Sequence, residues 1–397
     1  MPLHDPARHV SLPPRAWDPA VARAWLQRWA ASALGSWTRE GWPLHPSDVV
    51  EGEAPTPLRT LYCGEAGVWL ALARLAAAGL CALPTSLAEI FARVLAGYVA
   101  APDTGVAAPS WLFGESGLRT LCWLTAPTEA HADRLAALVD ENRDNPTCEA
   151  FWGAAGTMNA AWLLHRSTTE RRWVELWRAS ADALWERWTL DEASGTWLWG
   201  QVLDGHPSRY LGAGHGWAGN LHALWRGAAL LDDRRRALLR ERTLIGLERL
   251  AIVDGERATW PVEPGGAGKR LVQWCHGASG LLLALRPATI PEATPLLTKM
   301  AAMIADAGPL AKGVALCHGT AGSGAALLEI HRRTGDEVWR ARARGMAMAA
   351  LTQAEAAHAE HGRWHESLWT GDAGLAWLLL DCLEGRSRGL PGLDTLG

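Results

Sequence analysis

A Gly-x-x-Gly pair followed by an apolar run recurs along the chain, and this repeat constrains the fold more than any other feature. Glycine allows a sharp backbone turn and a close approach of neighbouring segments. The apolar run after each pair is typical of a helix that is buried on most sides. We therefore predict seven buried helices, each started by a glycine turn. The seven pairs begin at Gly64, Gly114, Gly153, Gly216, Gly277, Gly319 and Gly371.

Amphipathic segments separate the apolar ones. In residues 169–188, tryptophan and leucine recur at a helical spacing, with arginine and glutamate on the other faces. Strand patterns are scarce, although residues 196–199 could form a short strand. This alternation favours an all-α fold, a closed α/α toroid with about seven inner and about seven outer helices. Residues 1–50 would form an N-terminal extension with the first outer helix, 51–385 the toroid, and 386–397 a C-terminal tail.

Composition excludes several classes of function. The chain has 397 residues, 49 % of them hydrophobic, and a net charge of −4. It has no long basic run, so we expect no nucleic-acid partner. The longest apolar stretch, 67–83, contains Arg74 and is short for a bilayer, so we expect no membrane span. The N-terminal residues lack the apolar core of a signal peptide, and the seven cysteines are an odd number, so we expect a cytoplasmic protein with reduced thiols.

Two of the glycine turns carry a Cys-His pair directly before the first glycine. The pairs are Cys275-His276 and Cys317-His318. Cysteine and histidine are the preferred ligands of zinc, and a closed ring of helices would bring all the glycine turns to one mouth. We therefore predict one metal site built from both stretches. The alternatives are a structural zinc site or buried cysteines that bind no metal.

The chain resembles the lanthionine synthetase C family, the LanC and LanC-like proteins, over about residues 62–383. The resemblance rests on the sevenfold glycine turn and on the segments 210–219, 273–277 and 316–319. It implies an α/α toroid, which the repeat predicts independently. The Trp-Cys-His-Gly form of the second segment is more similar to the LanC-like branch than to the nisin-cyclase branch.

The resemblance implies a zinc centre and a general acid. Cys275, Cys317 and His318 would bind Zn²⁺ and leave its fourth position open, as a catalytic zinc requires. His276 would then not be a ligand but would contact the ligand shell or the substrate. His215, in the fourth glycine turn, would protonate the α-carbon of the substrate.

Three more residues are candidates for the site. Glu149 stands where the peptide cyclases carry an aspartate, and it would orient His215 or accept the thiol proton; the alternative is a carboxylate that only stabilises a helix start. Lys312, which the LanC-like branch uses for glutathione, would bind a substrate carboxylate; the alternative is a surface lysine. Arg270 would help to attract an acidic peptide or glutathione.

The function implied by the resemblance is zinc-dependent thioether formation. A Cys thiol would add to dehydroalanine or dehydrobutyrine and close a lanthionine ring in a dehydrated precursor peptide, with a separate dehydratase supplying the alkene. Two alternatives stay open: glutathione addition to dehydroamino acids, and a non-catalytic zinc protein that binds glutathione, a peptide or another protein. A toroid glycosidase would need two facing carboxylates from Glu149, Glu115 and Asp372, and it would leave both Cys-His pairs unexplained.

Overall fold

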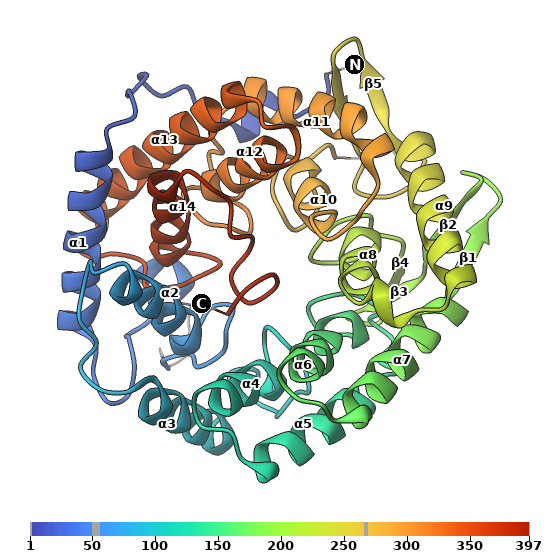
Figure 1. The fold of residues 1–397 in the computed structure, drawn as a ribbon. Helices are drawn as coiled ribbons and strands as arrows, with labels where there is room; N and C mark the ends of the chain where they lie inside the picture. Colours follow the sequence, from blue (N-terminus) through green and yellow to red (C-terminus); the bar gives the residue numbers. More distant parts are fainter. Residues whose placement is uncertain (1, 50–55, 266–268, 397) are drawn as a thin grey trace. The chain divides into compact units, whose positions relative to one another are not determined.

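The computed structural model describes residues 2–49, 56–265 and 269–396 (Figure 1). It divides into two compact units, which we describe separately. Unit 1 contains Met1–Pro6, Ala108–Leu112 and Pro127–Ala307, and unit 2 contains Ala7–Ala107, Phe113–Ala126 and Gly308–Gly397. The predicted boundary between residues 50 and 51 and the last residue of the predicted tail lie outside the described residues.

Unit 1 is mostly helical and carries all the named strands of the described residues. In Figure 1, α6 lies between α8 on one side and α5 and α7 on the other, and α8 also packs against α10. The helices are α5 (Glu129–Glu141), α6 (Ala154–Ser167), α7 (Arg171–Glu186), α8 (Trp217–Arg226), α9 (Asp233–Leu250), α10 (Ala278–Ala284) and α11 (Thr294–Ala307).

Three antiparallel hairpins connect some of these helices. They are β1 (Trp188–Asp191) with β2 (Thr196–Trp199), β3 (Gln201–Leu203) with β4 (His206–Ser208), and β5 (Ile252–Asp254) with β6 (Arg257–Thr259). The strand predicted at 196–199 is therefore present, and it pairs with Trp188–Asp191 in the register Thr189 opposite Leu198. The predicted amphipathic helix is also present as α7, which buries Trp173, Trp177 and Leu184.

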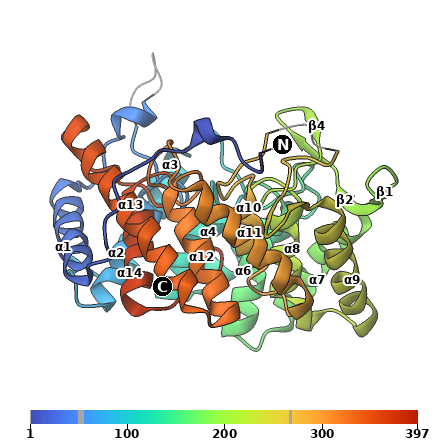
Figure 2. The same cartoon turned by 90° about the horizontal axis from the view of Figure 1, so that it is seen from above.

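Unit 2 is mostly helical in its described part, with longer loops such as 37–45 and 385–396. Figure 2 shows α1 alongside α2 and α14, and α13 packs against both α12 and α14. The helices are α1 (Pro19–Ser36), α2 (Glu65–Ala77), α3 (Leu87–Ala100), α4 (Glu115–Thr125), α12 (Thr320–Thr334), α13 (Glu337–His361) and α14 (Asp372–Glu384).

All seven predicted glycine turns start a helix, and the first glycine of each pair is the N-cap residue of α2, α4, α6, α8, α10, α12 or α14. These turns leave no space for a side chain. A Cβ on Gly280 would lie 1.7 Å from the carbonyl oxygen of Trp274, and one on Gly216 would lie 1.9 Å from that of Tyr210. Gly216 also has a φ of 134°, which favours glycine.

The loop before the helix closes in the same way in several turns. The N–H of the residue after the first glycine donates to the carbonyl oxygen six residues before that glycine. Ala278 donates in this way to Leu271 at 3.1 Å, and Thr320 donates to Gly313 at 2.8 Å. The repeat is therefore a structural unit with its own backbone hydrogen bonds, and the side chains just before the first glycine are held at a defined place.

Candidate active site

The fifth glycine turn holds Cys275 in a buried position of unit 1. Its Sγ accepts a hydrogen bond from Nε2 of Gln273 at 2.9 Å. Its carbonyl oxygen accepts one from the N–H of Gly214 at 3.0 Å, which attaches the fifth turn to the fourth. Because a short N–H···S contact stabilises a thiolate more than a thiol, this environment suits a metal ligand.

The fourth turn places His215 beside Glu149 of the third turn. Nδ1 of His215 lies 3.2 Å from Oε2 of Glu149, at an angle outside that of a hydrogen bond. The side chain of Glu149 is 0 % exposed. Its two oxygens accept hydrogen bonds from the N–H groups of Phe151 at 2.8 Å and Trp152 at 2.6 Å. The carboxylate is thus fixed where it can act as the counter-ion of a protonated His215 ring.

His276 stacks on His215. The ring centroids are 5.2 Å apart with an interplanar angle of 27°, and the ring of Tyr210 meets His276 edge-on at 4.9 Å. Burial, and then the charge of His215, lower the pKa of His276 to about 4. Its buried Nδ1 has no hydrogen-bond partner among the described residues. His276 is therefore an uncharged ring with a nitrogen that a bound molecule could use.

The sixth turn holds Cys317 and His318 in unit 2. Cys317 is buried, and its N–H donates to the carbonyl oxygen of Trp369 in the seventh turn at 3.0 Å. The N–H of Trp369 donates in turn to Tyr62 of the first turn at 3.1 Å. Burial lowers the pKa of His318 to about 4, and the charge of Lys312 acts in the same direction. Its imidazole is therefore uncharged, which is the form that binds a metal.

The predicted zinc ligands are divided between the units, with Cys275 in unit 1 and Cys317 and His318 in unit 2. Within either unit alone, the described residues contain no group of three His, Cys, Asp or Glu side chains that could hold a metal. The three-residue site remains a prediction. The donor set itself fits zinc, since it offers two buried sulfur atoms and one uncharged imidazole.

The other predicted residues occupy varied surroundings. Arg270 donates to the carbonyl oxygen of Pro2 at 2.6 Å, and Lys312 is exposed. Glu115 accepts from Nε of Arg119 at 2.7 Å. Asp372 accepts from the N–H of His365 at 2.7 Å, and burial raises its pKa to about 7. Both of these carboxylates thus have local partners, and unit 2 alone gives no support to a glycosidase.

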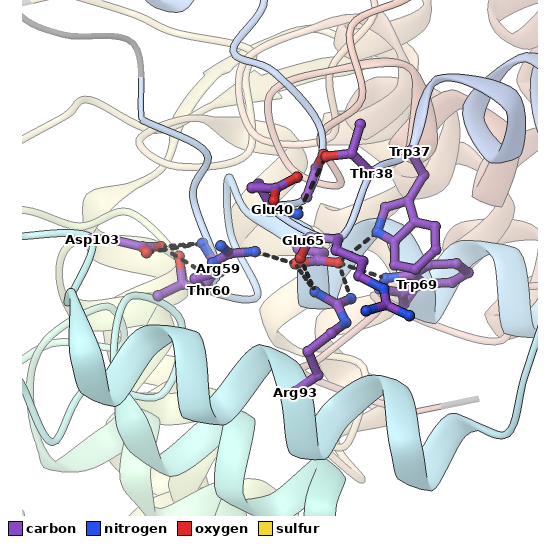
Figure 3. A network of polar contacts seen from close by, with 11 residues as sticks. Trp37, Thr38, Glu40, Arg59, Thr60, Glu65, Trp69, Arg93 and Asp103 are labelled. Carbon is purple, nitrogen blue, oxygen red and sulfur yellow. Dashed lines mark hydrogen bonds and ion pairs between the residues drawn. The ribbon is translucent and has the colours of Figure 1, made fainter.

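The first glycine turn contains a polar network that the sequence did not reveal (Figure 3). The buried carboxylate of Glu65 accepts hydrogen bonds from the indole N–H groups of Trp37 at 2.8 Å and Trp69 at 3.1 Å. It also accepts from Arg59 at 2.6 Å and forms an ion pair with Arg93. The available signal was an acidic residue directly after the first glycine, as in the second and seventh turns.

Two further contacts near the turns were missed. Gln273 bonds to Cys275, and its position two residues before that cysteine is the only sequence signal. His365 Nε2 lies 2.6 Å from Oδ2 of Asp48, and the ring of His45 stacks on that of His365 with centroids 4.6 Å apart. This pair joins residues far apart in the chain, so no local pattern could indicate it.

Comparison with known proteins identifies the family and the fold. The family model for "Lanthionine synthetase C-like protein" matches residues 54–395. LanC-like protein GCL1 of Arabidopsis thaliana is 28 % identical over 206 residues, which are 48 % of this chain and 44 % of that protein. The alignment thus spans less than half of this relative's length. Among solved structures, nisin cyclase matches with a TM-score of 0.61 and 15 % identity, covering 83 % of this chain and 90 % of that chain.

The likeness to nisin cyclase confirms the fold class predicted from the sequence, an all-α toroid of the LanC type. Among the described residues, no helix combines the length and the apolar character needed to cross a membrane. The family match covers all seven glycine turns and both Cys-His pairs. The chain therefore belongs to the lanthionine synthetase C-like family.

Proposed function

We propose that this protein is a zinc-dependent enzyme that forms thioethers in dehydrated peptides. The family and the fold shared with nisin cyclase support a cyclase-like activity. One observation in unit 1 carries the chemistry: the Glu149–His215 pair lies in turns next to the one that presents Cys275. A proton donor and a predicted metal ligand thus belong to neighbouring turns joined by the Gly214–Cys275 hydrogen bond.

Cys275, Cys317 and His318 would hold the zinc ion. Bound zinc would lower the pKa of an incoming thiol while leaving the sulfur nucleophilic. In the addition, the thiol first gives up its proton to solvent, the sulfur then bonds to the β-carbon of a dehydroamino acid, and the alkene electrons move toward the α-carbon and its carbonyl. The α-carbon then needs a proton.

His215 is the proposed source of that proton. Nδ1 of His215 faces Oε2 of Glu149 at 3.2 Å, which leaves the other ring nitrogen, Nε2, for the substrate. His276 stays uncharged because burial and His215 lower its pKa to about 4, so it can hydrogen-bond to the peptide without competing as an acid. The different surroundings of two stacked imidazoles thus separate an acid from a binding group.

The test is thioether formation in a peptide that contains one dehydroalanine and one cysteine. Cyclisation leaves the mass unchanged, so free thiols are counted after alkylation. We expect the wild-type protein to remove the free thiol, and Cys275→Ser and His215→Ala to lose this activity. Cys122→Ser, at a buried cysteine of α4, is the matched control and should retain it. Equal rates for the wild type and Cys275→Ser would contradict the proposal.

Glutathione is the second candidate thiol. Lys312 is an exposed cation whose charge reaches His318, so it could bind a carboxylate of glutathione as well as one of a peptide. The same assay with a cysteine-free dehydrated peptide and added glutathione separates the two reactions, because only the adduct gains mass. Stoichiometric zinc without either product would indicate a binding protein instead of an enzyme.

A further inference from the structure

The residue before Glu149 has an unusual backbone conformation. Cys148 has a φ of 45°, in the left-handed region that residues with a Cβ adopt at a cost. It is 1 % exposed, so neighbouring atoms hold it in place. The chain turns here, and the carboxylate of Glu149 accepts hydrogen bonds from the N–H groups of Phe151 and Trp152, which follow it in the sequence.

Asn220 holds this strained residue. Its Nδ2 donates to the carbonyl oxygen of Cys148 at 2.9 Å, and its side chain is fully buried. A carbonyl oxygen only accepts, which sets the orientation of the amide. The amide oxygen Oδ1 has no hydrogen-bond partner among the described residues. A buried amide that uses only one of its ends is costly, which indicates a role other than stability.

Asn220 also belongs to the segment that carries His215. Its own N–H donates to the carbonyl oxygen of Gly216 at 3.2 Å, in the first turn of α8. Gly219, beside it, allows the two segments to touch, because a Cβ there would lie 2.9 Å from Cβ of Ala150. The backbone of Asn220 is thus bonded to Gly216, the residue after His215, and its side chain is bonded to Cys148, the residue before Glu149.

We infer that Asn220 is a positioning residue, which sets the approach of the Glu149 carboxylate to the His215 ring by holding Cys148 in its left-handed conformation. Without this hydrogen bond, Cys148 can relax toward a negative φ, which turns Glu149 away from Nδ1 of His215. The expected loss of rate rests on the proposed function, whereas the expected movement of Glu149 does not. A displacement of this kind in an acid–base pair lowers a rate roughly tenfold to a hundredfold.

The test compares Asn220→Leu with Glu149→Gln. Leucine has the same branching as asparagine, so the fold is kept while the donor to Cys148 is removed. We expect kcat to fall, KM to change less than about twofold, and the pH profile to shift toward that of Glu149→Gln. Asn159→Leu is the control for losing a buried asparagine elsewhere: Nδ2 of Asn159 donates to Gly156 at 3.0 Å, and its Oδ1 accepts from Arg226 at 2.7 Å. It should keep the wild-type profile.

The side-chain ¹⁵N shifts of His215, measured in selectively labelled protein, give a readout that needs no turnover. Asn220→Leu should move them in the same direction as Glu149→Gln, and Asn159→Leu should not. If both asparagine variants lower kcat equally and leave these shifts unchanged, the inference is overturned. If the wild type forms no thioether but the shifts move as expected, the proposed function fails and the positioning role stands.

Discussion

Replacing Glu65 by alanine tests the network around the first glycine turn (Figure 3). Glu65 is the first residue of α2, and its side chain is 0 % exposed. One carboxylate oxygen accepts from Trp37 and Trp69, and the other lies 2.6 Å from Arg59. The substitution removes the acceptor that both of these indole N–H groups use among the described residues, and it leaves Arg59 and Arg93 without their shared counter-ion.

The magnitude follows from how well the remaining groups can be hydrated. Breaking a buried ion pair by removing one partner costs roughly 3–5 kcal/mol. The side chains of Arg59 and Arg93 are 16 % and 28 % exposed, so water can partly replace the carboxylate. We therefore expect the lower end of the range, about 3 kcal/mol, which corresponds to roughly 6–12 °C in Tm for a unit of this size.

The assay is thermal unfolding beside a matched control. Glu355 also joins two arginines, Arg15 at 3.1 Å and Arg28 at 3.2 Å, but its side chain is 38 % exposed. Glu355→Ala should cost only about 0–1 kcal/mol. Equal losses of Tm in the two variants would refute the argument that burial determines the cost.

The pH dependence provides a second check on the same residue. Burial raises the pKa of Glu65, but hydrogen bonds from Arg93 and the two indoles outweigh this and lower it. A carboxyl group with a lowered pKa stabilises the fold fully above its ordinary pKa, and this contribution is lost as the pH falls below it. As the pH falls, the free energy of unfolding of Glu65→Gln should therefore decrease less than that of the wild type. An equal decrease in both proteins would contradict a lowered pKa for Glu65.

Three further substitutions have defined outcomes. Gln273→Ala should weaken zinc binding roughly tenfold to a hundredfold in a chelator competition, because it removes the donor to Cys275. Gln27→Ala, at an exposed glutamine of α1, should leave zinc binding unchanged. Burial raises the pKa of Asp372 to about 7, so its charge destabilises the fold increasingly as the pH rises toward 7. Asp372→Asn should therefore raise Tm more at pH 8 than at pH 5, and equal shifts would contradict this. Arg242 lies 5.0–5.1 Å from three indole rings, so Arg242→Leu should cost roughly 1–2 kcal/mol in urea unfolding.

The glycine turns could be predicted because the constraint lies within a few residues. A Cβ at Gly280 would collide with a carbonyl oxygen only six residues earlier. The need for glycine therefore depends on a short segment, and it recurs wherever the turn recurs. The strand at Thr196–Trp199 and the buried face of α7 follow from equally local periodicity. In each case the pattern and the contact that explains it lie in one segment.

The hydrogen bonds that hold Cys148 and Glu65 could not be predicted, because they join different segments. Asn220 meets Cys148 from another turn, and the cost of the left-handed Cys148 is visible only in the backbone. Glu65 reaches Trp37 and Arg93, which belong to separate parts of the sequence. An acidic or amide side chain after a glycine turn shows that a partner is needed without showing which residue it is.

Register within the repeat explains why similar turns differ in chemistry. Cys275 and Cys317 both lie two residues before the first glycine, where the backbone is bonded to a neighbouring turn. Cys63 lies one residue later in its turn, beside Thr370, and burial raises its pKa to about 12. A thiol with that pKa stays protonated and is a poor ligand or nucleophile. The position of the proposed ligands and the position of Cys63 thus differ by one residue within the same kind of turn, so Cys63 is not expected to be a third sulfur ligand.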